Sequence, residues 1–136
     1  MRKILLSLTA ALTIGTAFAA PAAAERRSPE AQLAQEIEGR VAGDPVRCIQ
    51  ARNLRSRVIN RTAIVYEEGS TIYVNRLRGG RDSLNQFDVM VNDIRTSQIC
   101  SGEAVRMIDP AGGMLTGIVF LDEFVPYRRV RNSDGN

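Results

Sequence analysis

The sequence predicts a small, mainly β domain: an antiparallel barrel or sandwich of about five to seven strands with a short N-terminal helix. Short runs rich in β-branched and aromatic residues alternate with Gly, Pro, Asn and Asp turn residues. No segment repeats, and the central stretch 62–77 has the pattern of a β-hairpin. A chain of 136 residues has room for one domain.

The N-terminus has the pattern of a secretory signal peptide. Met1-Arg2-Lys3 is cationic, residues 4–18 are apolar, and both Ala17-Phe18-Ala19 and Ala22-Ala23-Ala24 fit the cleavage rule for small residues. The apolar stretch is short for a bilayer span, which needs about 20 strongly apolar residues. We therefore expect a signal peptide at 1–24, cleaved after Ala24, no membrane span, and a bacterial protein that is periplasmic or secreted.

Residues 25–45 predict a lead-in segment that is partly helical. Ser28 can cap a helix and Pro29 suits the first helical position. Three aliphatic residues then recur every four positions, at Leu33, Ile37 and Val41. The alternatives are a mobile linker and an amphipathic helix that binds a partner.

A single β domain is predicted at 46–127, followed by a disordered tail at 128–136. Its centre is the hairpin, in which 63–66 and 71–77 flank a turn at Glu67-Glu68-Gly69-Ser70. The β-branched and aromatic side chains suit a pleated surface, and the Gly is free to take a positive φ. Side chains alternate along a strand, so both faces of 63–66 are expected to pack.

Further strands are predicted on both sides of the hairpin. Even spacing favours one inward face for Val46, Cys48, Leu54 and Val58, if the chain bends near 50–53. Phe87, Val89 and Val91 alternate with Asp88, Met90 and Asn92, which is typical of a half-buried strand. The remaining strands are 99–100, 104–108 and 114–124, the last broken or bulged near Leu121-Asp122. Core packing is expected for the aromatic residues Tyr66, Tyr73, Phe87, Phe120, Phe124 and Tyr127.

The only two cysteines, Cys48 and Cys100, predict a disulfide. Export places them in an oxidising compartment, whereas a metal site would need more N or S ligands and the chain contains no His. A bridge closing a loop of this length contributes roughly 4 kcal/mol in the chain-entropy model.

From Cys48 onward the chain resembles a family of small exported bacterial proteins that is known only as a domain of unknown function. The resemblance covers about 46–127 and rests on the order and spacing of five segments. These are Cys48-Ile49, 61–66 (Arg-Thr-Ala-Ile-Val-Tyr), 72–77 (Ile-Tyr-Val-Asn-Arg-Leu), 99–103 (Ile-Cys-Ser-Gly-Glu) and 124–127 (Phe-Val-Pro-Tyr).

The chain departs from the family pattern at two positions. Where the family has a further pair of cysteines, this sequence has Arg81 and Val119. Because both cysteines are missing together, the resemblance implies that they bridge each other and that Cys48 and Cys100 form the other bridge. The resemblance implies no activity.

Composition excludes most catalytic chemistry. Without the signal peptide the chain has neither His nor Lys, so it lacks an imidazole base and a Schiff-base amine. No phosphate-binding Gly loop, nucleophile elbow or zinc spacing occurs. We predict no catalytic residue, no cofactor and no metal site. A carboxylate-dependent hydrolase remains open if two acids face one cleft, and its candidates are Glu67, Asp88, Asp109 and Asp122.

The strongest charge asymmetry is an acid-free run of five arginines, at Arg47, Arg52, Arg55, Arg57 and Arg61. Once Arg2 and Lys3 leave with the signal peptide, 16 cations face 15 acids, and the net charge is +1. The run is a candidate anion-binding site. The alternative is pairing with acids on neighbouring strands: Glu67, Glu68, Asp88 or Asp93.

Together these features predict a non-enzymatic binding or accessory module for an envelope component, which is another envelope protein or an anionic glycan. The alternatives are a carboxylate-dependent cell-wall hydrolase and a purely structural envelope protein. A nucleic-acid partner is not expected, because Arg78-Gly79-Gly80-Arg81 is a single copy of a motif that binds RNA in repeated form.

Overall fold

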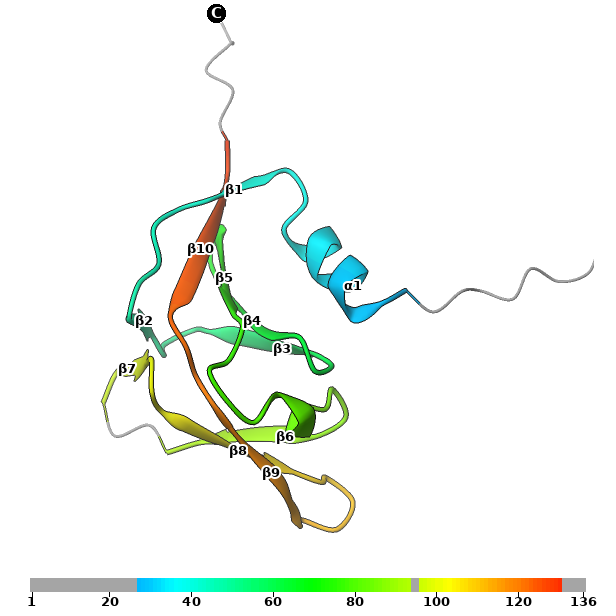
Figure 1. Ribbon diagram of the computed structural model, residues 1–136. Coiled ribbons are helices and arrows are strands. Elements are labelled where there is room, and N and C mark those ends of the chain that lie inside the picture. The colour runs from blue at the N-terminus through cyan, green and yellow to red at the C-terminus, as the bar shows by residue number, and fades with distance from the viewer. Residues whose placement is uncertain (1–26, 94–95, 131–136) are drawn as a thin grey trace, which may run out of the picture.

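The structure is a computed structural model that describes residues 27–93 and 96–130 (Figure 1). It contains one α-helix, α1 (Pro29–Glu36), and one 3-10 helix, η1 (Arg81–Ser83). The ten strands are β1 (Arg40–Ala42), β2 (Cys48–Gln50), β3 (Arg55–Ile59), β4 (Ala63–Glu68), β5 (Thr71–Asn75), β6 (Val89–Asn92), β7 (Gln98–Cys100), β8 (Ala104–Ile108), β9 (Leu115–Phe120) and β10 (Phe124–Arg129). The predicted mainly β class is confirmed.

The strands form three antiparallel sheets that do not close into a barrel and are consistent with a sandwich. The five-stranded sheet has the order β1-β10-β5-β4-β3, the three-stranded sheet the order β6-β8-β9, and β2 pairs with β7. In Figure 1 the three-stranded sheet lies below the five-stranded one. There are more strands than the predicted five to seven, because 46–59 and 114–129 each divide between two sheets and β1 adds a further short strand.

The predicted central hairpin is confirmed as β4 and β5. The turn is shorter than the predicted four residues, because Glu67 and Glu68 continue β4 and pair with Ile72 and Thr71. Gly69 and Ser70 alone form the turn, and Gly69 takes a φ of 57°. As expected, both faces of β4 are packed: the four residues 63–66 are at most 2% exposed.

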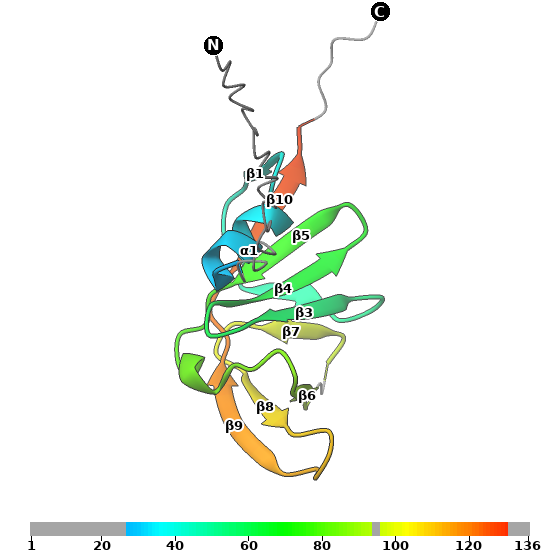
Figure 2. The same ribbon diagram turned by 90° about the vertical axis from the view of Figure 1, so that its right-hand side faces the viewer.

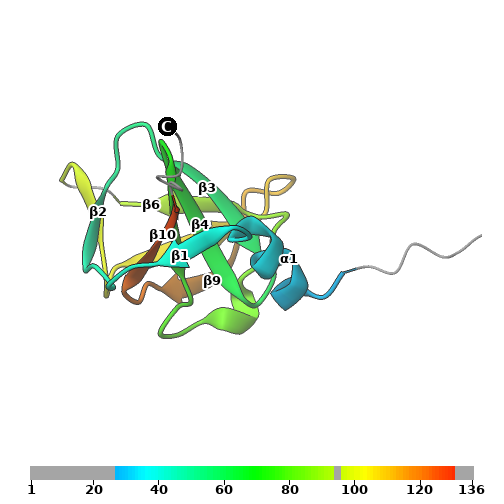
Figure 3. The ribbon, with the colours of Figure 1, turned by 90° about the horizontal axis from the view of Figure 1, so that it is seen from above.

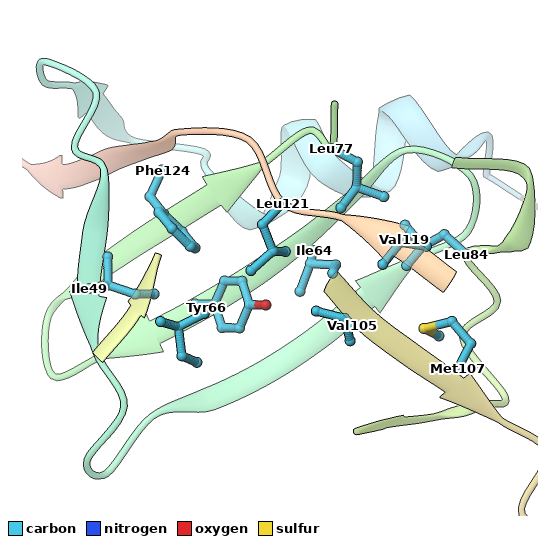
Figure 4. Close-up of a cluster of buried hydrophobic side chains, with 11 residues drawn as sticks. Ile49, Ile64, Tyr66, Leu77, Leu84, Val105, Met107, Val119, Leu121 and Phe124 are labelled. Carbon is cyan, nitrogen blue, oxygen red and sulfur yellow. The ribbon is translucent and has the colours of Figure 1, made fainter. Parts of the chain in front are cut away.

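The two faces of this hairpin belong to two separate hydrophobic clusters. Ile64 and Tyr66 point into the main core between the sheets, where the ring of Tyr66 meets Phe124 edge to face at 5.6 Å (Figure 4). Ala63 and Val65 point the other way and pack with Leu33 of α1. Figure 2 shows α1 lying across the outer face of the five-stranded sheet.

Residues 29–42 pack onto the β domain, whereas the sequence predicted a lead-in segment separate from it. The helix begins as expected, with Ser28 Oγ accepting a hydrogen bond from Ala31 N at 3.2 Å and Pro29 in the first turn. Leu33 is 1% exposed, and β1 pairs with β10. Because β10 extends to Arg129, the first two residues of the predicted tail are also in a strand. The predicted signal peptide and residues 131–136 lie outside the described residues.

Two ion pairs hold α1 on the sheet. Arg57 of β3 pairs with Glu36, and Arg76 donates to both carboxylate oxygens of Glu30 at 3.0 and 3.2 Å. These hydrogen bonds from Arg76 hold the pKa of Glu30 below its usual range. The helix is thus fixed at both ends, with Leu33 between them.

In two strands the face that meets the core is not the face that the spacing predicts. In β2 the buried residue is Ile49, at 3% exposure, whereas Val46 and Cys48 are exposed. In β6 Met90 lies opposite the buried Met107, so Val89 on the other face is 50% exposed. Alternation fixes which residues share a face, but only the pairing partner decides which face meets the core.

Two of the six aromatic residues expected in the core lie at the surface. Tyr66 and Phe124 are buried, and Tyr73 and Tyr127 are half-buried against the two clusters. Phe87 is 73% exposed and Phe120 is 44% exposed.

The predicted break near Leu121-Asp122 is present, and a buried amide holds it. The chain leaves β9 at Phe120 and enters β10 at Phe124, which moves it from one sheet to another. Asn75, fully buried, donates to Asp122 O at 2.6 Å and accepts from Asp122 N at 3.0 Å. Its side chain replaces the ladder partners that the crossing backbone loses.

The segment around η1 lies directly against β9. Gly79 bridges Phe120, and a Cβ at Gly80 would lie 2.8 Å from the Cα of Val119. Only Gly, with its φ of 75°, fits this approach. Arg81 and Val119, the two positions at which the expected family resemblance implies a further cysteine pair, therefore lie in adjacent segments.

We predict that Leu33→Ala destabilises the domain by about 2–5 kcal/mol, because it opens a cavity under α1. Urea unfolding measures the loss. The matched control is Ala34→Gln, an exposed site on the same helix, which should change the free energy of unfolding by at most about 0.5 kcal/mol. Equal effects of the two substitutions would contradict the packing of α1.

The buried phenol of Tyr66 should make the domain less stable at alkaline pH. Burial raises the pKa of its phenol well above the usual value, while the neighbouring Asn92 side chain opposes this more weakly. Among the described residues, neither Tyr66 Oη nor Asn92 Oδ1 has a partner in good hydrogen-bond geometry.

The unfolded chain loses the phenol proton near pH 10, whereas the folded chain retains it. The contribution of Tyr66 to the free energy of unfolding is therefore constant below about pH 10. Above that pH it decreases by about 1.4 kcal/mol per pH unit. Tyr66→Phe should remove this decrease and Tyr73→Phe should retain it, as measured by urea unfolding between about pH 9 and 11. Identical slopes in the two variants would refute the assignment to Tyr66.

Candidate functional site

The predicted disulfide is present between Cys48 and Cys100. The two residues lie directly opposite each other on β2 and β7, with Cα atoms 4.1 Å apart. The next pair along this ladder, Ile49 and Ile99, is 3% exposed on each side and enters the main core. The bridge thus anchors a two-stranded sheet of only three residues per strand, seen in Figure 3 on the side of the molecule away from α1.

The structure brings together two of the five candidate anion-binding arginines. Arg55 and Arg57 lie on one face of β3, opposite Glu67 and Val65 of β4. The other three occupy separate places: Arg47 precedes β2, Arg52 lies in the turn between β2 and β3, and Arg61 lies in the turn between β3 and β4.

Carboxylates accompany several of these arginines. Arg57 pairs with Glu36 and lies 3.9 Å from Glu67. Arg52 lines a hollow together with Glu68, and Arg61 lines another with Asp82. The alternative of pairing with neighbouring acids thus describes Arg57, although Glu36 comes from the helix rather than from a strand.

A groove of about 430 Å³ lies beside β3. Within the described residues β3 ends the five-stranded sheet and pairs only with β4, and β6 ends the three-stranded sheet and pairs only with β8. The groove is lined by α1, β3 and the segment that enters β6: Gln32, Glu36, Ser56, Arg57, Val58, Ile59, Gln86, Phe87, Asp88 and Met90. We call this feature the β3 groove.

The β3 groove combines an apolar floor with a fixed polar rim. Val58 and Met90 are half-buried against the main core, and Phe87 stands exposed at the edge. Asn60 Oδ1 accepts from Gln86 N at 2.6 Å, which ties the wall at 86–88 to the end of β3. The volume of the groove lies within the range of about 300 to 1,000 Å³ that is usual for binding sites.

The sequence pattern does not predict this groove. Its walls come from residues 32–36, 56–59 and 86–90, which only the tertiary structure brings together. The one available signal was the charged strand 55–59, which is typical of a sheet edge.

The four acids considered for hydrolysis are held by separate local contacts. Asp109 accepts from Gly112 N at 2.9 Å within its own turn, and Asp122 accepts from Glu123 N at 2.9 Å. Glu67 lies near Arg57, whereas Asp88 accepts from Thr116 Oγ1 at 2.5 Å and from Asn85 Nδ2 at 3.3 Å. Asp88 lines the β3 groove together with Glu36, so one pair of carboxylates does share a hollow.

The described residues offer no group of three or more His, Cys, Asp or Glu side chains that could hold a metal ion. Within the same residues, no helix has the length and apolar character needed to cross a bilayer.

Comparison with known proteins gave no match to a family model, to a curated protein or to a solved structure.

We predict that replacing both cysteines, in Cys48→Ser/Cys100→Ser, lowers the free energy of unfolding by roughly 4 kcal/mol, because the bridge closes a loop of 52 residues. Urea unfolding of the oxidised and the doubly substituted protein measures this difference. The oxidised protein should also present no thiol to an alkylating reagent under denaturing conditions. Two reactive thiols in protein purified without reductant would contradict the bridge.

Proposed function

We propose that this protein is an exported, non-enzymatic binding module that holds an extended segment of another envelope protein in the β3 groove. The observation that carries the proposal is the pair of open strand edges, β3 and β6, beside a groove with an apolar floor. The signal-peptide pattern and the disulfide support export to an oxidising compartment. The resemblance to the family of exported proteins of unknown function remains part of this proposal.

An extended chain suits the groove better than a compact ligand. An edge strand presents N–H and C=O groups without ladder partners, and these groups pair with a strand that is added alongside. Alternate side chains of that strand would then face Val58 and Met90 on the floor.

The charge of the groove favours a neutral or weakly basic segment. Its lining carries two carboxylates, Glu36 and Asp88, and one cation, Arg57, which already pairs with Glu36. A Lys or Arg on the added strand would meet Asp88, whereas an acidic side chain would be repelled there.

An anionic glycan receives less support than a protein partner. Only Arg55 and Arg57 share a face, and Arg57 is engaged with Glu36 and Glu67. Arginines on an edge strand also have a simpler role, since charged side chains discourage unwanted pairing between sheet edges.

The hydrolase alternative rests on Glu36 and Asp88, which line the same groove. Both carboxylates are already engaged, Glu36 by Arg57 and Asp88 by Asn85 and Thr116. Turnover of purified cell-wall glycan, abolished by Glu36→Gln and Asp88→Asn, would replace the binding proposal with this alternative.

Thermal melting in the presence of three groups of probes tests the proposal. The probes are peptides of eight residues selected by phage display, envelope glycan fragments, and polyanions. A ligand at 100 times its dissociation constant stabilises the fold by about 2.7 kcal/mol, which for a domain of this size raises Tm by roughly 10 °C or more. We expect the peptides to raise Tm and the polyanions to leave it unchanged.

A matched pair of variants locates the binding. Phe87→Ser removes the exposed ring at the groove edge, whereas Met114→Ser removes an equally exposed side chain from the turn between β8 and β9. The first variant should lose the shift induced by peptide and the second should retain it. A shift caused by polyanions and lost in Arg55→Gln would instead support the glycan partner.

A further inference from the structure

The outward side of the three-stranded sheet is apolar, although a sheet face that meets water is normally polar. Met90, Val105, Met107 and Val119 point into the main core, so the residues that alternate with them point outward. The outward residues are Val89, Val91, Ala104, Arg106, Ile108, Leu115, Ile118 and Phe120. We call this set the outer face. A register shift at Met107/Ile108 places Leu115 opposite Ile108, and the exposed Thr116 is the extra residue of β9 at this shift.

The register arranges the outer face in continuous rows across the three strands. Val89, Ile108 and Leu115 form one row, and Val91, Arg106 and Ile118 form the next. Val89 is 50%, Leu115 55%, Ile118 40% and Phe120 44% exposed. With about 200 Å² for a Phe side chain and about 100 Å² for an aliphatic one, these four side chains expose roughly 230 Å². Val91, Ala104 and Ile108, which are also partly accessible, bring the exposed apolar area of the outer face to roughly 300 Å².

The single charge on this face is already compensated. Arg106 Nη2 lies 3.0 Å from Asp93 Oδ1 at the end of β6, and both side chains remain about half-exposed or more. The outer face with Asp93 therefore has no net charge, and two identical faces can approach without like-charge repulsion.

We infer that two copies of this chain associate through their outer faces in a symmetric dimer. Two sheets packed face to face are the usual way in which apolar sheet faces are buried, and twofold dimers are the commonest oligomers. The rotation can place Arg106 of each copy near Asp93 of the other. This association goes beyond the proposed binding of an envelope protein and leaves the floor of the β3 groove free.

The area predicts a weak, reversible dimer. Homodimer interfaces are about 65% apolar, so roughly 300 Å² of apolar surface corresponds to about 500 Å² for each partner. The total of about 1,000 Å² is at the lower limit for a specific interface, which places the dissociation constant in the micromolar range or above.

Sedimentation velocity tests the dimer on the processed protein obtained by expressing the full chain. Between about 5 and 500 µM the mean sedimentation coefficient should rise from the monomer value towards that of the dimer. Ile118→Glu should remove this rise. Val41→Glu is the matched control, because Val41 is an exposed aliphatic residue on β1 of the other sheet, and it should leave the rise unchanged.

A charge-swap experiment assigns the contact to two copies of the same face. Arg106→Asp alone and Asp93→Arg alone should each remain monomeric, because like charges then meet across the interface. An equimolar mixture of the two variants should dimerise at least as well as the unmodified protein. The charge-swap mixture also tests the dimer if Ile118→Glu does not fold.

Two results would overturn the inference. One is an unmodified protein that sediments as a monomer at every concentration, which would leave the outer face to a different partner. The other is association that persists in folded Ile118→Glu or in Arg106→Asp alone, which would place the contact elsewhere.

Discussion

Burial of β4 on both of its faces determines how the other elements are arranged. Four consecutive residues, 63–66, are almost fully inaccessible, so the hairpin needs cover on two sides. The three-stranded sheet and the β2-β7 pair cover the side of Ile64 and Tyr66, and α1 covers the side of Ala63 and Val65. The helix is therefore part of the folded domain, even though its own sequence is short and mostly polar.

The chain is short for two covering layers, and local devices hold the second half of the molecule in place. The disulfide joins β2 to β7, where three residues per strand would pair weakly by themselves. Asn75 holds the crossing from β9 to β10, and Gly80 lets η1 lie directly on β9. Each device acts where the backbone changes sheet or makes a close approach, and each occupies few residues.

Because the chain is short, strand edges and one sheet face remain uncovered within the described residues. The five-stranded sheet stops at β3 and the three-stranded sheet stops at β6, and the β3 groove lies beside them. Among the residues that the structure describes, nothing covers the outward side of the three-stranded sheet as α1 covers the other sheet, although seven of the eight residues of the outer face are apolar. An open edge and an apolar face are both features that proteins bury against partners. The groove and the outer face therefore carry the two interactions proposed for this molecule.

Local sequence patterns were sufficient to predict the mainly β class, the central hairpin, the helix start at Ser28 and the break near Leu121-Asp122. Each of these follows from local chemistry: β-branched runs, a Gly with positive φ, a side-chain cap and alternation. Long-range packing determines that Ile49 and Met90 face inward, that Phe87 is exposed, and that Glu36, Ser56 and Asp88 line one groove. Alternation defines two faces of a strand but carries no information on which face meets the core, because that choice depends on partners distant in the chain.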